Sequence, residues 1–316
     1  MIARGPRRRG AWLFAGIVAL FCALLAASGR EYFEGAPREH NYLLRAGDLV
    51  GVTRLRLEGS VADASDHSYY YRPKVLLDGA QDDVRVNLRF PGDGAQAAAV
   101  QSRLLATREK DTLVLRWSAA SDPARARWQV LRNDRIEIVL PTRFTQLILE
   151  RGSVEARSAM EQLQVSGALV TVKGRVGHLD LSSTQCPQSC AKQARETQGK
   201  ETDNCAQFMR ETSALKIDAH GMQSIRVSAA IGKVELTHTE ELKQLDLRLA
   251  DPVSLSVDRV APLFDAIRRG AGQRADLAAC QPLTVPAPAR DAAALELVTD
   301  DRPWPRTKSE TGDDYD

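Results

Sequence analysis

Four cysteines in the second half of the chain could do chemistry: Cys186, Cys190, Cys205 and Cys280. Outside the cytoplasm, an even number of cysteines favours disulfides. The spacing of Cys186 and Cys190 places both thiols on one face of a helical turn, so each is expected to pair elsewhere. We predict Cys190–Cys205, closing a helical hairpin, and Cys186–Cys280, tying that insertion to a C-terminal helix. A metal site is the alternative, but the C-x2-C spacing typical of zinc sites does not occur here.

Three histidines are a second candidate site. His178, His220 and His238 lie on or beside predicted strands, and Asp180 and Asp218 are close to two of them. Imidazole and carboxylate groups on neighbouring strands would bind a transition metal if they converged. Their offsets differ, because His178 precedes its apolar pair whereas the other two follow theirs. We therefore expect surface histidines, and we predict no metal and no cofactor.

A glycine-rich loop at residues 92–97 fits the G-x-G-x-x-A form of dinucleotide-binding loops, between a predicted strand and a predicted helix. Pro91 interrupts the strand end, however, and the next predicted strand, Leu113–Trp117, ends without the acidic residue that binds ribose. We interpret the loop as an ordinary turn. The sequence also lacks the G-x-S-x-G nucleophile elbow. We assign no catalytic residue and do not expect an enzyme, with an envelope hydrolase or metal-dependent enzyme as the alternative.

The first 29 residues are typical of a targeting segment. Arg4, Arg7, Arg8 and Arg9 precede an uncharged apolar run at residues 12–28, which ends in small residues before Gly29. This pattern indicates a signal peptide, or an uncleaved anchor in the inner membrane. We therefore expect a protein exported to the periplasm or cell envelope, with membrane contact through residues 12–28 if the leader stays attached.

The charge of the exported part argues against a nucleic-acid partner. The chain has 43 basic and 41 acidic residues, and residues 1–29 contain four of the basic ones and none of the acidic ones. The remainder has 39 basic and 41 acidic residues, a net charge of −2. Proteins that bind nucleic acid usually carry a strong basic patch.

A ladder of short strands between Phe144 and Val257 must position any of these residues. Pairs of apolar residues, each separated by one outward residue, begin at intervals of 7, 9, 7 and 9. An i, i+2 pair puts both side chains on one face of a strand. Repetition at a fixed period predicts stacked short strands in a β-solenoid-like fold. The pairs are Leu147/Leu149, Val154/Ala156, Leu163/Val165, Val170/Val172 and Leu179/Leu181, and later Leu215/Ile217, Ile225/Val227, Val234/Leu236, Leu245/Leu247 and Val253/Leu255.

The rest of the chain is divided around this ladder. A lead-in segment (30–47) precedes a β-rich N-terminal part (48–141), which contains one Ala-rich helix at about Ala95–Thr107. The ladder occupies 142–260 and carries the helical, disulfide-bearing insertion at 184–212. We predict a capping helix in the segment 261–281. The helix is expected from about Asp258 to Gly270, with Pro262 near its first turn and Gly270 past its end. An acidic, Pro-rich tail at 282–316 is predicted to be disordered.

The segment from Arg135 to Val260 resembles the bacterial putative-adhesin family. The features that carry the resemblance are the strand ending at Leu140-Pro141, the run from Leu147 to Ala156 around Gly152, and the run from Leu163 to Val172 around Gly167. The resemblance implies a β-solenoid-like envelope domain and adhesion, with no site residues to transfer. The expected function is therefore non-enzymatic binding or scaffolding of an envelope protein or polysaccharide through the β-surface. A periplasmic carrier of an apolar ligand is a further alternative.

Overall fold

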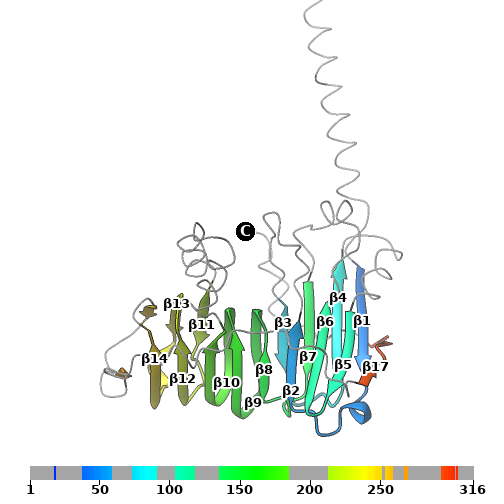
Figure 1. The fold of residues 1–316 in the computed structure, drawn as a ribbon, viewed down its shortest axis with the longest axis horizontal. Helices are drawn as coiled ribbons and strands as arrows, with labels where there is room; N and C mark the ends of the chain where they lie inside the picture. The colour runs from blue at the N-terminus through cyan, green and yellow to red at the C-terminus, as the bar shows by residue number, and fades with distance from the viewer. Residues whose placement is uncertain are drawn as a thin grey trace, which may run out of the picture.

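The structure is a computed structural model that describes residues 18, 38–58, 73–90, 104–117, 135–184, 213–250, 253–258, 267–269, 293–302 and 304. Its strands stand side by side in a long row, with β1 and β17 at one end and β14 near the other (Figure 1). Hydrogen bonds connect 18 strands into one continuous sheet. The prediction of a mainly β protein is confirmed.

The elements up to the ladder are β1 (Arg38–Leu44), the 3-10 helix η1 (Ala46–Leu49), β2 (Arg54–Glu58), β3 (Lys74–Leu77), β4 (Val84–Phe90), β5 (Leu104–Glu109), β6 (Thr112–Trp117), β7 (Arg135–Leu140) and β8 (Gln146–Ile148). The later elements are β9 (Arg151–Gly167), β10 (Leu169–Ser183), β11 (Ala214–Asp218), β12 (Ser224–Ala229), β13 (Lys233–Thr237), the 3-10 helix η2 (Thr239–Glu241), β14 (Gln244–Leu249), β15 (Ser254–Val257), β16 (Ile267–Arg269), β17 (Ala293–Leu295) and β18 (Val298–Thr299).

The chain alternates between two columns of paired strands. The first column runs β17, β5, β6, β2, β8, residues 162–167 of β9, residues 178–183 of β10, β12, β14 and β16. The second runs β18, β1, β4, β7, β3, residues 151–156 of β9, residues 169–174 of β10, β11, β13 and β15. Pairing is parallel along most of both columns and antiparallel at the β17 and β18 ends.

The predicted apolar pairs of the ladder form the core. The five pairs from Leu147/Leu149 to Leu179/Leu181 are all buried and belong to one apolar cluster with the inward residues of the N-terminal strands. Equivalent residues of successive rungs lie side by side, because each rung consists of one strand from each column. In the first column the aligned residues are Leu163, Leu179, Ile225 and Leu245, and in the second they are Val170, Leu215, Val234 and Leu255.

The ladder continues in register across the insertion at 184–212, of which only Thr184 lies within the described residues. Residues 169–173 pair with 214–218 on its far side. The last predicted pair is displaced by two residues: Leu255 and Val257, rather than Val253 and Leu255, lie beside Val234 and Leu236. Val253 instead packs partly buried against the core from the turn before β15.

Both helices that the sequence predicted outside the insertion are corrected where the structure describes them. Residues 104–107, the end of the expected Ala-rich helix, belong to strand β5, since Leu104 and Ala106 alternate inward and pair with β6. Residues 267–269, within the expected capping helix at 261–281, form strand β16 and pair in parallel with β14. The edge of β14 stabilises an extended chain there, so tertiary pairing overrides the local helical pattern.

The two ends of the chain are also more ordered than predicted. The expected lead-in at 30–47 contains strand β1, whose Tyr42 and Leu44 are buried in the core. The expected disordered tail at 282–316 contains β17 and β18, and Trp304 is only 9% exposed. The prediction of a disordered tail was wrong over the described residues, because this segment pairs with β1 and β5, which are remote in sequence.

Several predicted features lie outside the described residues. They are Cys186, Cys190, Cys205 and Cys280, the glycine-rich loop at 92–97, and the leader except Val18. Within the part of the chain that the structure describes, no helix has the length and apolar character needed to cross a membrane.

Candidate binding surface

The outward side chains of the ladder form polar rows across neighbouring strands. In the first column these are Gln162, Gln164 and Ser166 of β9, His178, Asp180 and Ser182 of β10, Ser224, Arg226 and Ser228 of β12, and Gln244, Asp246 and Arg248 of β14. All twelve are half-buried or exposed. Aligned strands place each row's members about 4.8 Å apart. We call these twelve residues the polar face.

Hydrogen bonds and ion pairs join neighbouring members of the polar face. Arg226 lies between two carboxylates, with Nε 3.1 Å from Asp246 Oδ2 and Nη1 3.8 Å from Asp180 Oδ2. Ser166 and Ser182 share a hydrogen bond of 2.7 Å between their hydroxyls. These contacts hold the side chains of the rows in place. The hydrogen-bond donors and acceptors that face solvent therefore have fixed positions.

The second column also carries charges on its outer side. Lys173 Nζ lies 3.2 Å and Lys74 Nζ 4.0 Å from Glu155 Oε2, and Arg157 Nε lies 3.5 Å from its Oε1. Burial acts to raise the pKa of Glu155, but the three cations outweigh it, and the pKa lies below its usual value. Glu235 lies between Lys233 and Lys216, whose hydrogen bonds likewise lower its pKa. Opposite charges alternate from strand to strand on this side.

The structure brings two of the three histidines together. The rings of His220 and His238 meet edge to face with centroids 6.4 Å apart, at the corners that follow β11 and β13. His238 Nδ1 lies 2.9 Å from Asp218 Oδ1, while the His238 backbone N–H donates to Asp258 Oδ2 at 2.6 Å. Each of these hydrogen bonds joins residues 20 positions apart, on the corners of successive rungs.

His178 lies apart from that corner, on the polar face, where Nδ1 shares a hydrogen bond of 2.9 Å with Ser224 Oγ. The sequence offsets had argued against convergence of the three histidines at a metal site; His220 and His238 come together because the corners they occupy are stacked. His238 is 60% exposed in its side chain. Within the described ranges, no group of three or more His, Cys, Asp or Glu residues is arranged to hold a metal ion.

The outer side of the N-terminal half differs from the ladder because charged groups are buried on it. The Glu58 side chain is 1% exposed and accepts hydrogen bonds from Arg56 at 2.6 Å and from Arg116 at 2.6 and 2.8 Å. Arg56 also donates to Glu109 at 2.7 Å. These pairs join β2, β6 and β5 into one network. The Arg56 and Arg116 side chains therefore cover Glu58 on the outer side of this half.

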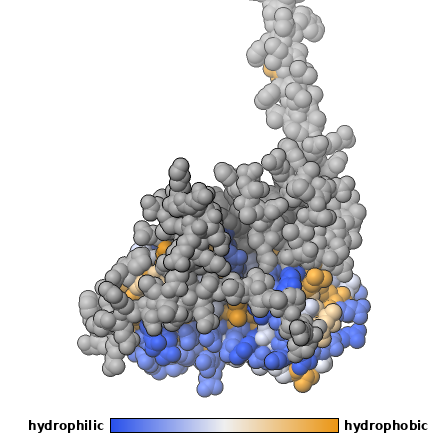
Figure 2. All heavy atoms as spheres, viewed as in Figure 1, coloured by the Kyte–Doolittle hydropathy of each residue, from blue (hydrophilic) through white to orange (hydrophobic). Residues whose placement is uncertain are grey.

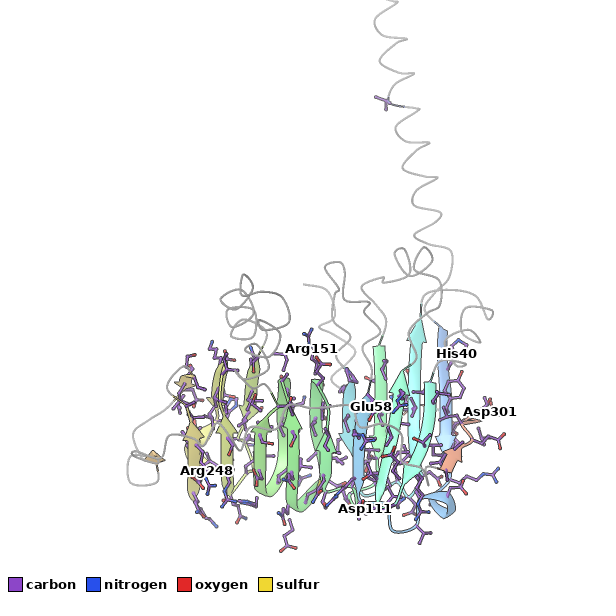
Figure 3. All side chains as sticks on the ribbon, viewed as in Figure 1. His40, Glu58, Asp111, Arg151, Arg248 and Asp301 are labelled. Atoms are coloured by element: carbon purple, nitrogen blue, oxygen red, sulfur yellow. The ribbon has the colours of Figure 1, made fainter. Side chains whose placement is uncertain are left out.

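The C-terminal segment closes the β1 end of the stack. We call residues 293–302 and 304 the clasp. Its β17 pairs with β5 of the first column and its β18 with β1 of the second, while Leu295 and Leu297 pack against the core. Figure 3 shows Asp301 next to the strand that carries His40, although the two are far apart in the sequence. The clasp therefore joins the two columns at their first strands.

Two clasp residues, Asp300 and Trp304, contact the outer side of the second column. Asp300 Oδ2 accepts a hydrogen bond of 2.6 Å from Arg85 Nε, and both side chains are under 5% exposed. Trp304 packs on Leu76 and Val139 and donates from Nε1 to Glu137 Oε2 at 2.6 Å. The Arg85 guanidinium lies 5.3 Å from the Trp304 ring centroid. Sequence reasoning missed this site, and the only local signal was a tryptophan within an acidic segment.

The charge of Asp300 is stabilised within the clasp. Burial acts to raise its pKa, but hydrogen bonds from Arg302 and Arg85 outweigh it, so the pKa lies below its usual value. Arg302 Nε lies 2.8 Å from Asp300 Oδ1, and Arg302 Nη2 lies 3.5 Å from Asp83 Oδ2. Asp300 therefore stays ionised where it meets β4.

Comparisons with known proteins give little further information. No family model and no curated protein matches this chain. Among solved structures, a cell adhesion protein from Clostridium sporogenes, described as putative, aligns with a TM-score of 0.29 and 8% identity, over 70% of this chain and 99% of that one. The function must be argued from the surface itself.

Proposed function

We propose that this chain is a non-enzymatic, exported protein of the cell envelope that binds a protein or polysaccharide partner through its polar face. The observation that supports this is the row of Arg226, Asp180 and Asp246 with its serine and glutamine neighbours, held in register over four strands and open to solvent. A stacked β-structure is a rigid, extended surface on which such rows repeat.

The rigidity of the polar face favours binding of an extended partner. Ordered side chains lose little conformational entropy when a partner binds, and this entropy is a major cost of association. Hydroxyl, amide and charged groups also match the hydrogen-bonding groups of a polysaccharide or a polar protein surface. Most of the described residues along the lower edge of the stack, where the strands end, are hydrophilic (Figure 2).

The rival functions fit the geometry less well. A hydrolase or metal enzyme needs its acid, base or ligands in a site that excludes water, but the corner of His220 and His238 is exposed. A carrier of apolar ligands needs an open groove lined by the apolar pairs. Those pairs instead pack against one another in the core, with Leu163, Leu179 and Leu181 at 0% exposure.

Export and family membership belong to the same proposal. The Arg-flanked apolar run at 12–28 supports export and, if it is retained, attachment to the inner membrane. The periodic pairs around Gly152 and Gly167 support membership of the putative-adhesin family. Export would be tested by the mass of the native N-terminus and by the location of the protein in cell fractions.

Matched substitutions on one strand test the role of the polar face. Ser182→Arg places a long cation on the polar face, and Thr171→Arg places the same side chain on the outer side of the other column, also on β10. Binding to purified envelope polysaccharides and isolated envelope proteins is measured by interferometry, with thermal melting as a control for folding. We expect Ser182→Arg to weaken binding about tenfold or more and Thr171→Arg to leave it unchanged. Equal effects of both, or no binding by the unsubstituted chain, would contradict the proposal.

A further inference from the structure

The clasp rests on a site that we call the seat, formed by Leu76, Arg85, Glu137 and Val139 together with the edge of β1. It presents an apolar floor of Leu76 and Val139, a cation at Arg85 and an acceptor at Glu137. Beside it, the edge of β1 offers backbone groups: β18 pairs with Tyr42 and Leu43, and the Asp300 N–H donates to Asn41 O at 2.8 Å. The site therefore accepts a short extended segment with an acidic residue followed four positions later by tryptophan.

The chain's own C-terminal segment meets every one of these requirements. Asp300 contacts Arg85, Trp304 fills the apolar floor, and Thr299 and Val298 complete the edge pairing. A second copy of the chain carries the same segment, so its fit to this seat is already demonstrated by the contacts made within one chain. We propose that the seat also binds the clasp of a second copy, so that two chains exchange clasps reciprocally.

The length of the connection is compatible with such an exchange. In the first column, β16 and β17 are separated by nine strand-to-strand steps, or about 43 Å at 4.8 Å per step. The connection between them, residues 270–292, has 23 residues, and a chain of this length reaches at most about 80 Å. The connection is therefore longer than its own seat requires by up to about 37 Å, and this surplus allows the clasp to leave that seat for the seat of another copy.

The exchanged form would be a closed, symmetric dimer. When two copies each place their clasp on the other, the same contacts form twice around a twofold axis and no seat is left open. Closure within one chain has the advantage of a high effective concentration, so the single chain dominates in dilute solution. Exchange is favoured when the contacts within one chain are weakened or when copies are concentrated.

Charge reversal of the Arg85–Asp300 pair tests this directly. Arg85→Asp and Asp300→Arg are made in separate full-length chains with different affinity tags, together with the double variant. Each single variant has two like charges in its own seat. When the two single variants are mixed, the Asp300 clasp of one meets the native Arg85 seat of the other, and the reversed pair forms at the second seat. One of the two seats in the mixed dimer therefore has the native Arg85–Asp300 pair. Exchange should be detected at that seat even if the reversed pair fits its own seat poorly.

The two single variants are mixed after partial unfolding and refolding in a mild detergent, captured through one tag and weighed by light scattering. We expect the mixture to co-purify as a species of two chains, with capture about tenfold above that of either variant with itself. We expect the double variant, matched within one chain, to remain a single chain. The proposal is overturned if the mixed variants are not captured together above the level of each variant alone, or if the double variant self-associates as strongly as the mixture.

Discussion

Gly174→Ala is the substitution whose cost can be worked out most directly from the structure. Gly174 lies where β10 passes from the second column to the first and the register with β9 shifts. Its φ is +113°, in the region that L-residues rarely adopt. A Cβ added there would lie 2.3 Å from the carbonyl oxygen and 2.8 Å from the nitrogen of Ala156. Both contacts are with backbone atoms of the adjacent rung. The clash therefore cannot be relieved by rotating a side chain, and the backbone itself must move.

The magnitude follows from two terms. Holding an alanine at such a φ costs about 1–3 kcal/mol. Moving the backbone of Ala156 away disturbs a close-packed core on both sides, which brings the total to about 3–5 kcal/mol, among the larger effects of single substitutions. Set against a typical stability of about 5–15 kcal/mol, this should lower the melting temperature by about 6–20 °C.

The assay is thermal unfolding followed by circular dichroism in the β-strand band, with Gly47→Ala as the matched control. A Cβ at Gly47 has nothing within 4 Å, so its effect should stay within about 0.5 kcal/mol. Equal melting temperatures for the two variants would refute the reasoning, because they would show that the rungs are not stacked backbone to backbone at Gly174.

Three further predictions concern the clasp and the polar face. Trp304→Ala should lower the free energy of unfolding, measured with urea, by about 3 kcal/mol. It should also raise the rate of amide hydrogen exchange at Asp300 but not in β12, and an equal rise at both places would contradict a local role for Trp304. Because the pKa of Asp300 is lowered on folding, its charge stabilises the fold above pH 3.8, its ordinary pKa, and this contribution is lost as pH falls toward the lower native pKa. Asp300→Asn should therefore flatten the acid side of the stability profile, measured by urea unfolding from pH 6 downwards, whereas parallel profiles would exclude this role. Arg226→Gln should change stability by less than about 1 kcal/mol, since its ion pairs are partly exposed; a larger loss in the same assay would show that the row supports the fold.

The ladder could be predicted from the sequence because its signal is local. Each strand buries alternate residues, and the interval between pairs equals the length of strand plus corner, so Leu163, Leu179 and Ile225 could be assigned to the core without knowing their neighbours. The exact pairing of rungs was less accessible. Leu147 lies beside Val165 rather than Leu163, because the corner inside β9 (157–161) is two residues longer than the corner inside β10 (175–177).

The corner of His220 and His238 was missed for a related reason. Offsets were judged relative to each strand, whereas position along the stack depends on the whole rung. Asp218, His238 and Asp258 recur at intervals of 20, and the hydrogen bonds between them follow that interval. His220 and His238 are 18 positions apart and meet because the corners after β11 and β13 belong to successive rungs.

The clasp was beyond sequence reasoning because its contacts have no local signature. The Arg85–Asp300 pair joins residues 215 positions apart, and β17 and β18 are only three and two residues long. Short segments between prolines and acids resemble a disordered tail, and they become ordered only because the edges of β1 and β5 accept them. The same edges explain the site's importance. A stack of strands exposes unpaired backbone at its end, and here β17 and β18 cover the edges of β5 and β1. Whether that cover comes from the same chain or from a second copy changes the assembly but leaves the contacts that form the seat unchanged.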